Sequence, residues 1–268
     1  MFNLIQKWNF PSNNYGQIFG IADSGVETFK GTPIKSLARE ICQNSLDAAL
    51  ENGEPTRIEF KTFEIDPHKI PDYSNLEDAL KRALDFWSQQ QSTKAKTFFK
   101  QALDVIHKST ITCLRISDFN TSGLVGSREE YNSPWCNLTK SSGASDKSGS
   151  HGGSFGIGKF APYACSSLRT VFYSTSDKDG LCASQGVSRL TSFKSKKNEI
   201  TQGTGFYGND KNSPMYKQFS LDPAYSRSAE NSGTDIFIAA FNGDKGWQHQ
   251  MVASVLDGFL YAIYNGTL

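Results

Sequence analysis

Two carboxylates and an amide recur at helical spacing near residue 44. Glu40, Asn44 and Asp47 are four and then three residues apart, so in a helix of about 3.6 residues per turn they share one narrow stripe. The adjacent stripe is apolar and is expected to face the core; it consists of Ile34, Leu37, Ile41 and Ala48. At the edge of a buried face, one carboxylate can activate water beside an amide that holds a metal ion.

A glycine-rich segment further along the chain allows three nucleotide-binding readings. Residues 153–159 match a phosphate-binding P-loop, but Phe160 takes the place of the Ser or Thr that would hold Mg²⁺. Residues 156–161 match a dinucleotide fingerprint, but a polar, glycine-rich stretch precedes them instead of a strand. The third reading is Gly-x-x-Gly-x-Gly over residues 153–158. Only this reading also uses the Glu/Asn helix and the strand before Asp118.

The elements that must position these residues mix helices and strands. Residues 1–31 are rich in breakers and are expected to be irregular. Periodicity predicts helices at 33–50, 75–87, 93–108, 160–167 and 247–264, and strands at 57–65, 111–117, 168–174, 182–190 and 234–241. The second strand delivers Asp118 at its end. The two middle helices form an inserted hairpin, about 74–109, and residues 120–154 form a long, weakly apolar loop of the functional kind.

This order lacks strict strand–helix–strand alternation. It predicts an α+β fold, a two-layer sandwich with helices on one face of a mixed, mainly antiparallel sheet. A chain of 268 residues can form one large domain, and we expect a single domain over residues 1–268.

Four motifs in order resemble those of the GHKL (Bergerat-fold) ATPases, the group of Hsp90, gyrase B, MutL and MORC. The first is Glu-x-x-x-Asn-x-x-Asp-Ala at residues 40–48, and the second follows a strand and begins at Asp118. The third is Gly-x-x-Gly-x-Gly at residues 153–158, and the fourth is Gly233-Thr234 at the start of a late strand. The resemblance spans residues 40 to 237 and implies a Bergerat ATP-binding fold with a mobile lid at about 120–154.

The resemblance also implies a role for each matching residue. Glu40 is the general base for the attacking water, Asn44 holds Mg²⁺, and Asp118 accepts a hydrogen bond from the adenine amine. Thr234 supports that contact, Asp47 supports the site by hydrogen bonding, and the glycines bring backbone N–H groups to the phosphates. The implied ligands are ATP and Mg²⁺, and the expected binding residues are Asn44, Asp47, Ala48, Asp118, Asn120, Gly123, Gly153, Ser154, Phe155, Gly156, Ile157, Gly158, Lys159 and Thr234.

One position departs from the family pattern. Asn120 stands where the second motif usually has glycine, and Ser122-Gly123 stands where the next glycine falls. Because asparagine tolerates positive φ better than most residues, the turn is expected to survive. The departure puts the backbone contacts of residues 120–123 in question, but not Asp118.

Composition narrows the partners and the compartment. The net charge is +1, which gives no support to a nucleic-acid partner, although one stays open. The sequence contains no run of about 18 apolar residues, so no membrane span is predicted. The N-terminus lacks the apolar core of a signal peptide, and five scattered cysteines form no CxxC pair. A cytoplasmic protein without a zinc site is expected.

Three functions remain open. The first is an ATP hydrolase in which the lid closes on ATP and the chain forms an ATP-dependent homodimer, with the general resemblance favouring a bacterial defence-type system. The second is an ATP-responsive interaction module with negligible hydrolysis. The third is the histidine kinase branch, which generally lacks a glutamate at position 40. Relatives carry a transducer domain after this one, so we expect the N-terminal part of a longer protein.

Overall fold

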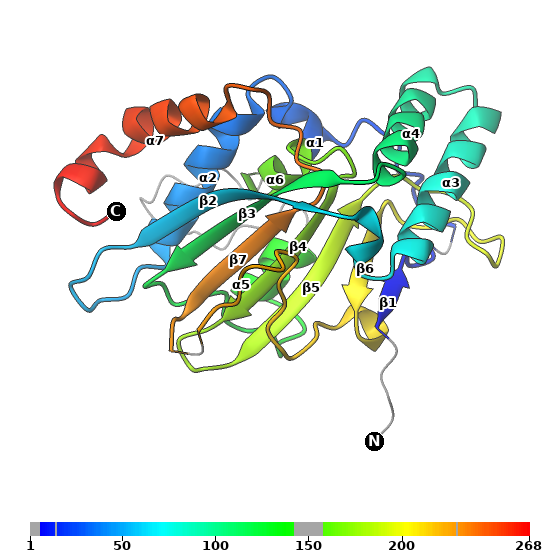
Figure 1. Ribbon diagram of the computed structural model, residues 1–268. Coiled ribbons are helices and arrows are strands. Elements are labelled where there is room, and N and C mark those ends of the chain that lie inside the picture. The colour runs from blue at the N-terminus through cyan, green and yellow to red at the C-terminus, as the bar shows by residue number, and fades with distance from the viewer. Residues whose placement is uncertain (1–5, 14, 142–157, 229) are drawn as a thin grey trace.

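An antiparallel sheet forms the centre of the molecule (Figure 1). The computed structural model describes residues 6–13, 15–141, 158–228 and 230–268. In this part of the chain seven strands pair in the order β1-β6-β5-β4-β7-β3-β2, and every paired neighbour is antiparallel. The strands are β1 (Lys7–Asn9), β2 (Arg57–Ile65), β3 (Ile111–Phe119), β4 (Thr170–Ser176), β5 (Cys182–Arg189), β6 (Thr204–Gly208) and β7 (Gly233–Ile238).

Seven α-helices accompany the sheet in the described ranges. They are α1 (Ser24–Phe29), α2 (Pro33–Asp47), α3 (Tyr73–Gln89), α4 (Thr93–Ile106), α5 (Pro134–Thr139), α6 (Ala161–Ala164) and α7 (Trp247–Tyr264). None of these helices is long and apolar enough to cross a membrane. The mixture of helices with an open antiparallel sheet is compatible with the predicted α+β sandwich.

Alternation along the strands divides the core between the two sheet faces. On β3, Leu114 and Ile116 pack with α2 and α7, whereas Cys113 packs with α3 and α4 on the opposite face. Figure 1 shows α2 beside α7 along one side, and the α3–α4 hairpin apart from them. The prediction that helices cover a single face is therefore wrong, because the hairpin has its own apolar stripe and buries it against the second face.

Several predicted elements have the expected positions. The strand at 57–65 and the helix at 247–264 have the predicted bounds, and the two helices of the insert pack against each other. The outer side of α7 nevertheless exposes Val252, Leu256, Leu260, Tyr261 and Tyr264. The helix predicted at 247–264 is thus apolar on more than its core side.

Short elements were missed. Residues 1–31 contain β1 and α1, the long loop contains α5, and β6 lies where no strand was predicted. These elements have three to six residues, which is too short to show a period. Most other bounds differ by a few residues: α2 ends at Asp47 rather than near Leu50, β3 continues through Asp118 to Phe119, and β4 begins at Thr170 rather than at 168. The helix predicted at 160–167 is the shorter α6, and the strand predicted at 234–241 ends at Ile238.

Glu27 joins the insert to the rest of the molecule. Its carboxylate accepts hydrogen bonds from Lys30 at 2.5 Å, Lys94 of α4 at 2.9 Å and the buried Arg169 at 3.3 Å. Burial alone would raise the pKa of Glu27, but the hydrogen bonds and charges of Lys30 and Lys94 outweigh it and lower the pKa from 4.5 to about 2. These ion pairs therefore contribute fully above pH 4.5 and are lost as the pH falls toward 2.

We expect Glu27→Gln to lower the free energy of unfolding at pH 7 by about 1–2 kcal/mol, a figure reduced for partial exposure of the carboxylate. Urea unfolding at pH 7 and pH 3 measures this, and the difference from the wild type should shrink at pH 3. Glu51→Gln, at an exposed loop position, is the control. A gap that is as large at pH 3 as at pH 7 would contradict the charge argument.

Candidate functional site

Helix α2 presents the predicted polar stripe at the edge of its buried face. It begins with proline at the first turn, where a missing N–H costs nothing. Glu40 is half-buried, while Asn44 and Asp47 are exposed. Asn44 Nδ2 donates to Glu40 Oε1 at 2.9 Å, so these two side chains are in contact. Asp47 accepts a hydrogen bond from Gln43 at 2.8 Å, and Ala48, expected in the apolar stripe, is the half-buried residue that ends the helix.

Glu40 lies directly against the backbone that leads into α6. A Cβ placed on Gly158 would overlap the Glu40 carboxylate, so the chain can approach this carboxylate only where a side chain is missing. Gly158 opens a short 3₁₀ turn, Gly158–Phe160, that precedes α6. Glu40 of the first motif and Gly158, the last glycine of the third motif, therefore lie side by side.

Lys159 contacts helix α5 in this structure. It is 8 % exposed, and its Nζ donates to the backbone carbonyl of Asn137 in α5 at 2.5 Å. Burial lowers the pKa of Lys159, and the charge of Arg189 adds to this effect, while Cys136 and Glu40 oppose it. In this arrangement Lys159 satisfies a carbonyl near the C-terminal end of α5, where a cation is favourable.

Asp118 is the most constrained carboxylate of the site. Its oxygens accept hydrogen bonds from the Ser45 hydroxyl at 3.1 Å, the Thr121 hydroxyl at 2.8 Å and the backbone N–H of Thr234 at 2.7 Å. These donors come from α2, the turn after β3, and β7. Burial raises the pKa of Asp118, whereas these hydrogen bonds and the charge of Arg227 oppose the rise. The residue keeps a small exposed fraction.

The turn after β3 is tied to the end of α2 and holds Asp118 beside that helix. Asn120 has φ of 59°, as its tolerance of the left-handed region predicted. Its side chain donates to the Glu54 carbonyl at 2.7 Å, and Ser122 N donates to the Ala48 carbonyl at 2.7 Å. Gly123 also has positive φ, and a Cβ there would lie 2.7 Å from the Ser176 carbonyl. The turn therefore forms with both Asn120 and Gly123 at positive φ.

Five predicted binding residues lie outside the described part of the chain: Gly153, Ser154, Phe155, Gly156 and Ile157. Most of the third motif and the end of the proposed lid belong to this range. Within the described residues, no group of three or more His, Cys, Asp or Glu side chains is placed to hold a metal ion. A Mg²⁺ ion at this site would have Asn44 as its protein ligand, with phosphates and water completing its shell.

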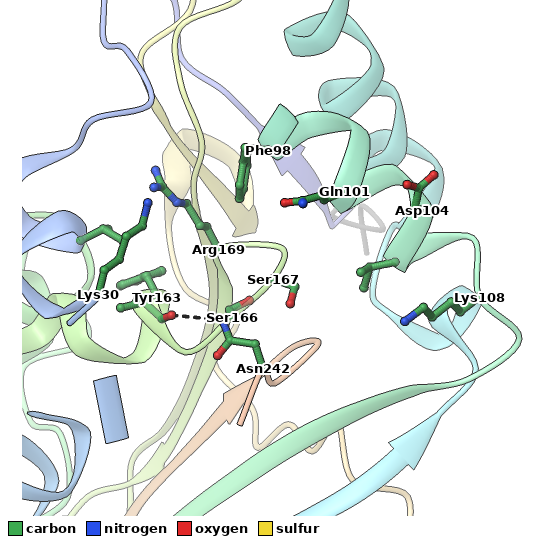
Figure 2. A pocket seen from close by; sticks show the side chains of 13 residues that line it. Lys30, Phe98, Gln101, Asp104, Lys108, Tyr163, Ser166, Ser167, Arg169 and Asn242 are labelled. Atoms are coloured by element: carbon green, nitrogen blue, oxygen red, sulfur yellow. Dashed lines mark hydrogen bonds between the residues drawn. The ribbon is translucent and has the colours of Figure 1, made fainter. Parts of the chain in front are cut away.

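A separate hollow of about 500 Å³ lies between the insert and the body. Figure 2 shows Phe98, Gln101, Asp104 and Lys108 along one side, opposite Lys30, Arg169, Ser167 and Asn242. None of the predicted site residues lines it. Its buried cation is already bound, because Arg169 donates to the Ile21 carbonyl at 3.0 Å and to Glu27. The chemistry thus points to Glu40 and Asp118 rather than to this hollow.

Sequence reasoning missed three residues that touch or face Asp118. Ser45 carried a usable signal, because a polar residue on the buried side of α2 needs a hydrogen-bond partner. Thr121 and Arg227 carried none, since a threonine in a turn and an arginine in a loop are ordinary there.

No model of a known protein family matches this chain, and no curated protein matches it either.

We expect Asn120→Ala to destabilise the protein by about 1 kcal/mol more than Asn120→Gly, because only alanine carries a Cβ into the left-handed region. Both variants lose the same side-chain hydrogen bonds, so the difference reports the backbone. Thermal or urea unfolding measures it, and Asn52→Ala, which removes a hydrogen-bond partner of Asn120, is the control. Equal losses in the two Asn120 variants would show that φ is not the constraint.

Proposed function

We propose that this protein binds ATP with Mg²⁺ between α2, β3 and β7 and hydrolyses it to ADP and phosphate, as a Bergerat-type ATPase that uses lid closure and dimerisation as a switch. The observation that supports this most is the state of Asp118. A carboxylate offers about four acceptor positions, and three are used by Ser45, Thr121 and Thr234. One hydrogen-bond acceptor position therefore remains on Asp118, which is partly exposed.

A single free acceptor on a fixed carboxylate fits one N–H of an amine. The adenine 6-amino group supplies such a donor, and guanine, with an oxygen at that position, does not. Since unpaired polar groups in a buried site are costly, Asp118 would favour adenine over bases that lack the donor. The three protein donors hold the carboxylate in place, so the base would not have to order it on binding.

Glu40 and Asn44 supply the groups needed at the phosphate end. Glu40 can accept a proton from water, provided that the water lies within hydrogen-bond reach. Asn44 contacts Glu40 directly, which places a neutral oxygen-bearing ligand beside the base. When bound, Mg²⁺ would offset the charge of the phosphates. Gly158 lets the chain reach this point, and the remaining backbone donors are expected from the glycine-rich segment that ends there.

Equilibrium binding of ATP and Mg²⁺-dependent phosphate release test the proposal. The wild type should bind ATP and release phosphate. Glu40→Gln should bind ATP with little change but lose phosphate release by about 100-fold or more. Asp118→Asn should weaken ATP binding by about 10-fold or more, the effect of losing a hydrogen bond to a charged acceptor.

Asp104→Asn, on the exposed side of α4, is the control and should change neither binding nor turnover. If the wild type binds ATP but never releases phosphate, the interaction-module function replaces hydrolysis, because binding does not need Glu40. A wild type that binds no adenine nucleotide would refute the proposed function altogether.

Gly158→Ala tests the contact between the two motifs. The added Cβ would overlap the Glu40 carboxylate, so we expect the glutamate to move and phosphate release to fall by at least about 10-fold, as for a misplaced base. ATP affinity should change less than turnover. Gly31→Ala is the matched control, since Gly31 lies in the turn between α1 and α2, lacks a positive φ, and a Cβ there meets nothing. Unchanged turnover in Gly158→Ala would show that the position of Glu40 does not matter for hydrolysis, and would exclude Glu40 as the general base.

A further inference from the structure

A buried ion pair lies behind Asp118, on the sheet face away from α2. Arg227 Nη2 donates to Asp235 Oδ1 at 2.7 Å and Arg227 Nε donates to Asp235 Oδ2 at 2.9 Å. Arg227 is 6 % exposed and Asp235 2 % exposed. Such a two-point pair fixes the plane and position of the guanidinium. The Tyr225 hydroxyl also donates to Asp235 at 2.9 Å, so the acid that holds the arginine is itself held.

Gly233 allows the guanidinium to come close to Asp118. A Cβ on Gly233 would lie 2.6 Å from Arg227 Nη1 and 2.8 Å from Asp118 Oδ1. Both atoms thus border the small space that the missing side chain leaves open. Gly233 has φ of 148°, a conformation that side chains rarely permit. Because the fourth motif has glycine at this position, no side chain lies between the fixed cation and the carboxylate.

The same arginine also anchors the turn that contributes to the carboxylate's shell. Arg227 Nη1 donates to the Ser232 carbonyl at 3.4 Å, and its guanidinium carbon lies 4.6 Å from the ring centre of Phe119. The Ser232 hydroxyl donates to the Thr121 carbonyl at 2.6 Å. Thr121 in turn donates to Asp118. The loop before β7 and the turn after β3 are in this way connected around the acid.

A carboxylate in this setting needs a compensating charge. Burial raises the pKa of Asp118, and among charged groups Arg227 opposes that rise. Arg227 keeps its own charge, because its hydrogen bonds and charge pairing with Asp235 outweigh burial and raise its pKa. The three groups that donate hydrogen bonds to Asp118, the Ser45 and Thr121 hydroxyls and the Thr234 N–H, are all neutral. Neutral donors orient a carboxylate, whereas a fixed cation also stabilises its charge.

We propose that Arg227, fixed by Asp235, is a positioning residue for base recognition: its charge, reaching past Gly233, keeps Asp118 an anionic acceptor for the 6-amino group of adenine. This inference rests on the proposed ATP site and adds the source of its base selectivity. Arg227 acts on Asp118 through its charge, across the space at Gly233. In this scheme it does not contact the base. Its effect should therefore be confined to the part of the binding energy that the 6-amino group contributes.

The test compares two nucleotides that differ only in that group. Isothermal titration measures the dissociation constants of ATP and of purine riboside 5′-triphosphate, which lacks the amine, and their ratio is the amine preference. Arg227→Gln keeps a donor for Asp235 but removes the charge, and it should lower the preference by about 10-fold, the value of a charge-assisted hydrogen bond. Arg227→Lys keeps the charge and should retain most of the preference.

Arg169→Gln is the matched control. Arg169 is also a buried arginine paired with an acid, Glu27, but it precedes β4 at the end of the sheet away from Thr234. The Arg169→Gln variant should be less stable than the wild type but should keep the amine preference. Thermal unfolding of each variant shows which ones fold. If Arg227→Gln does not fold, Arg227→Met, which also lacks the charge, carries the same comparison with Arg227→Lys.

The outcomes separate the inference from the function on which it rests. A loss of preference in Arg227→Gln with retention in Arg227→Lys supports the inference. An unchanged preference in the uncharged variant, or an equal loss in the lysine variant, overturns it while ATP binding stands. A wild type that binds ATP without any amine preference overturns base recognition by Asp118 and the inference together. A wild type that binds neither nucleotide refutes the proposed function first.

Discussion

The structure around the candidate site depends on satisfying one carboxylate inside the protein. Asp118 lies at the end of β3, an interior strand of the sheet, and a charged group in that position is tolerated only if donors surround it. The donors come from a helix, a turn and a neighbouring strand, so the acid fixes the relative positions of all three. The same requirement explains why Ser45 is polar on the buried side of α2. A polar group that is costly to bury thereby determines how the helix sits on the sheet.

Two glycines perform a similar task at the two ends of this site. Gly158 admits the carboxylate of Glu40, and Gly233 admits that of Asp118. In each case an acid lies where a side chain would otherwise be, so the backbone itself forms the wall beside the acid. At Gly233 this arrangement brings the neighbouring Thr234 N–H to the carboxylate of Asp118.

Much of the fold could be predicted because long elements have clear periods. The strand 57–65 and the helix 247–264 are long enough for the pattern to specify type and bounds. For the paired helices of the insert the pattern specified the type, and the bounds to within two residues. The contact of Glu40 with Asn44 and the positive φ of Asn120 also followed from residue type and spacing. By contrast, Arg227 and Thr121 reach Asp118 through pairing between distant segments, which one sequence does not reveal. The partner of Lys159 depends on α5, whose six residues were too few to recognise.

The strand order has a consequence for how the protein is made. Asp118 and the Thr234 N–H that binds it are 116 residues apart, and β7 must enter between β3 and β4, which precede it in the chain. Contacts over such separations are slow to form. During synthesis, β3 therefore leaves the ribosome long before its partner exists. Until β7 is in place, Asp118 lacks its backbone donor and Arg227 lacks Asp235, so the β2–β3 pair cannot join the rest of the sheet through β7.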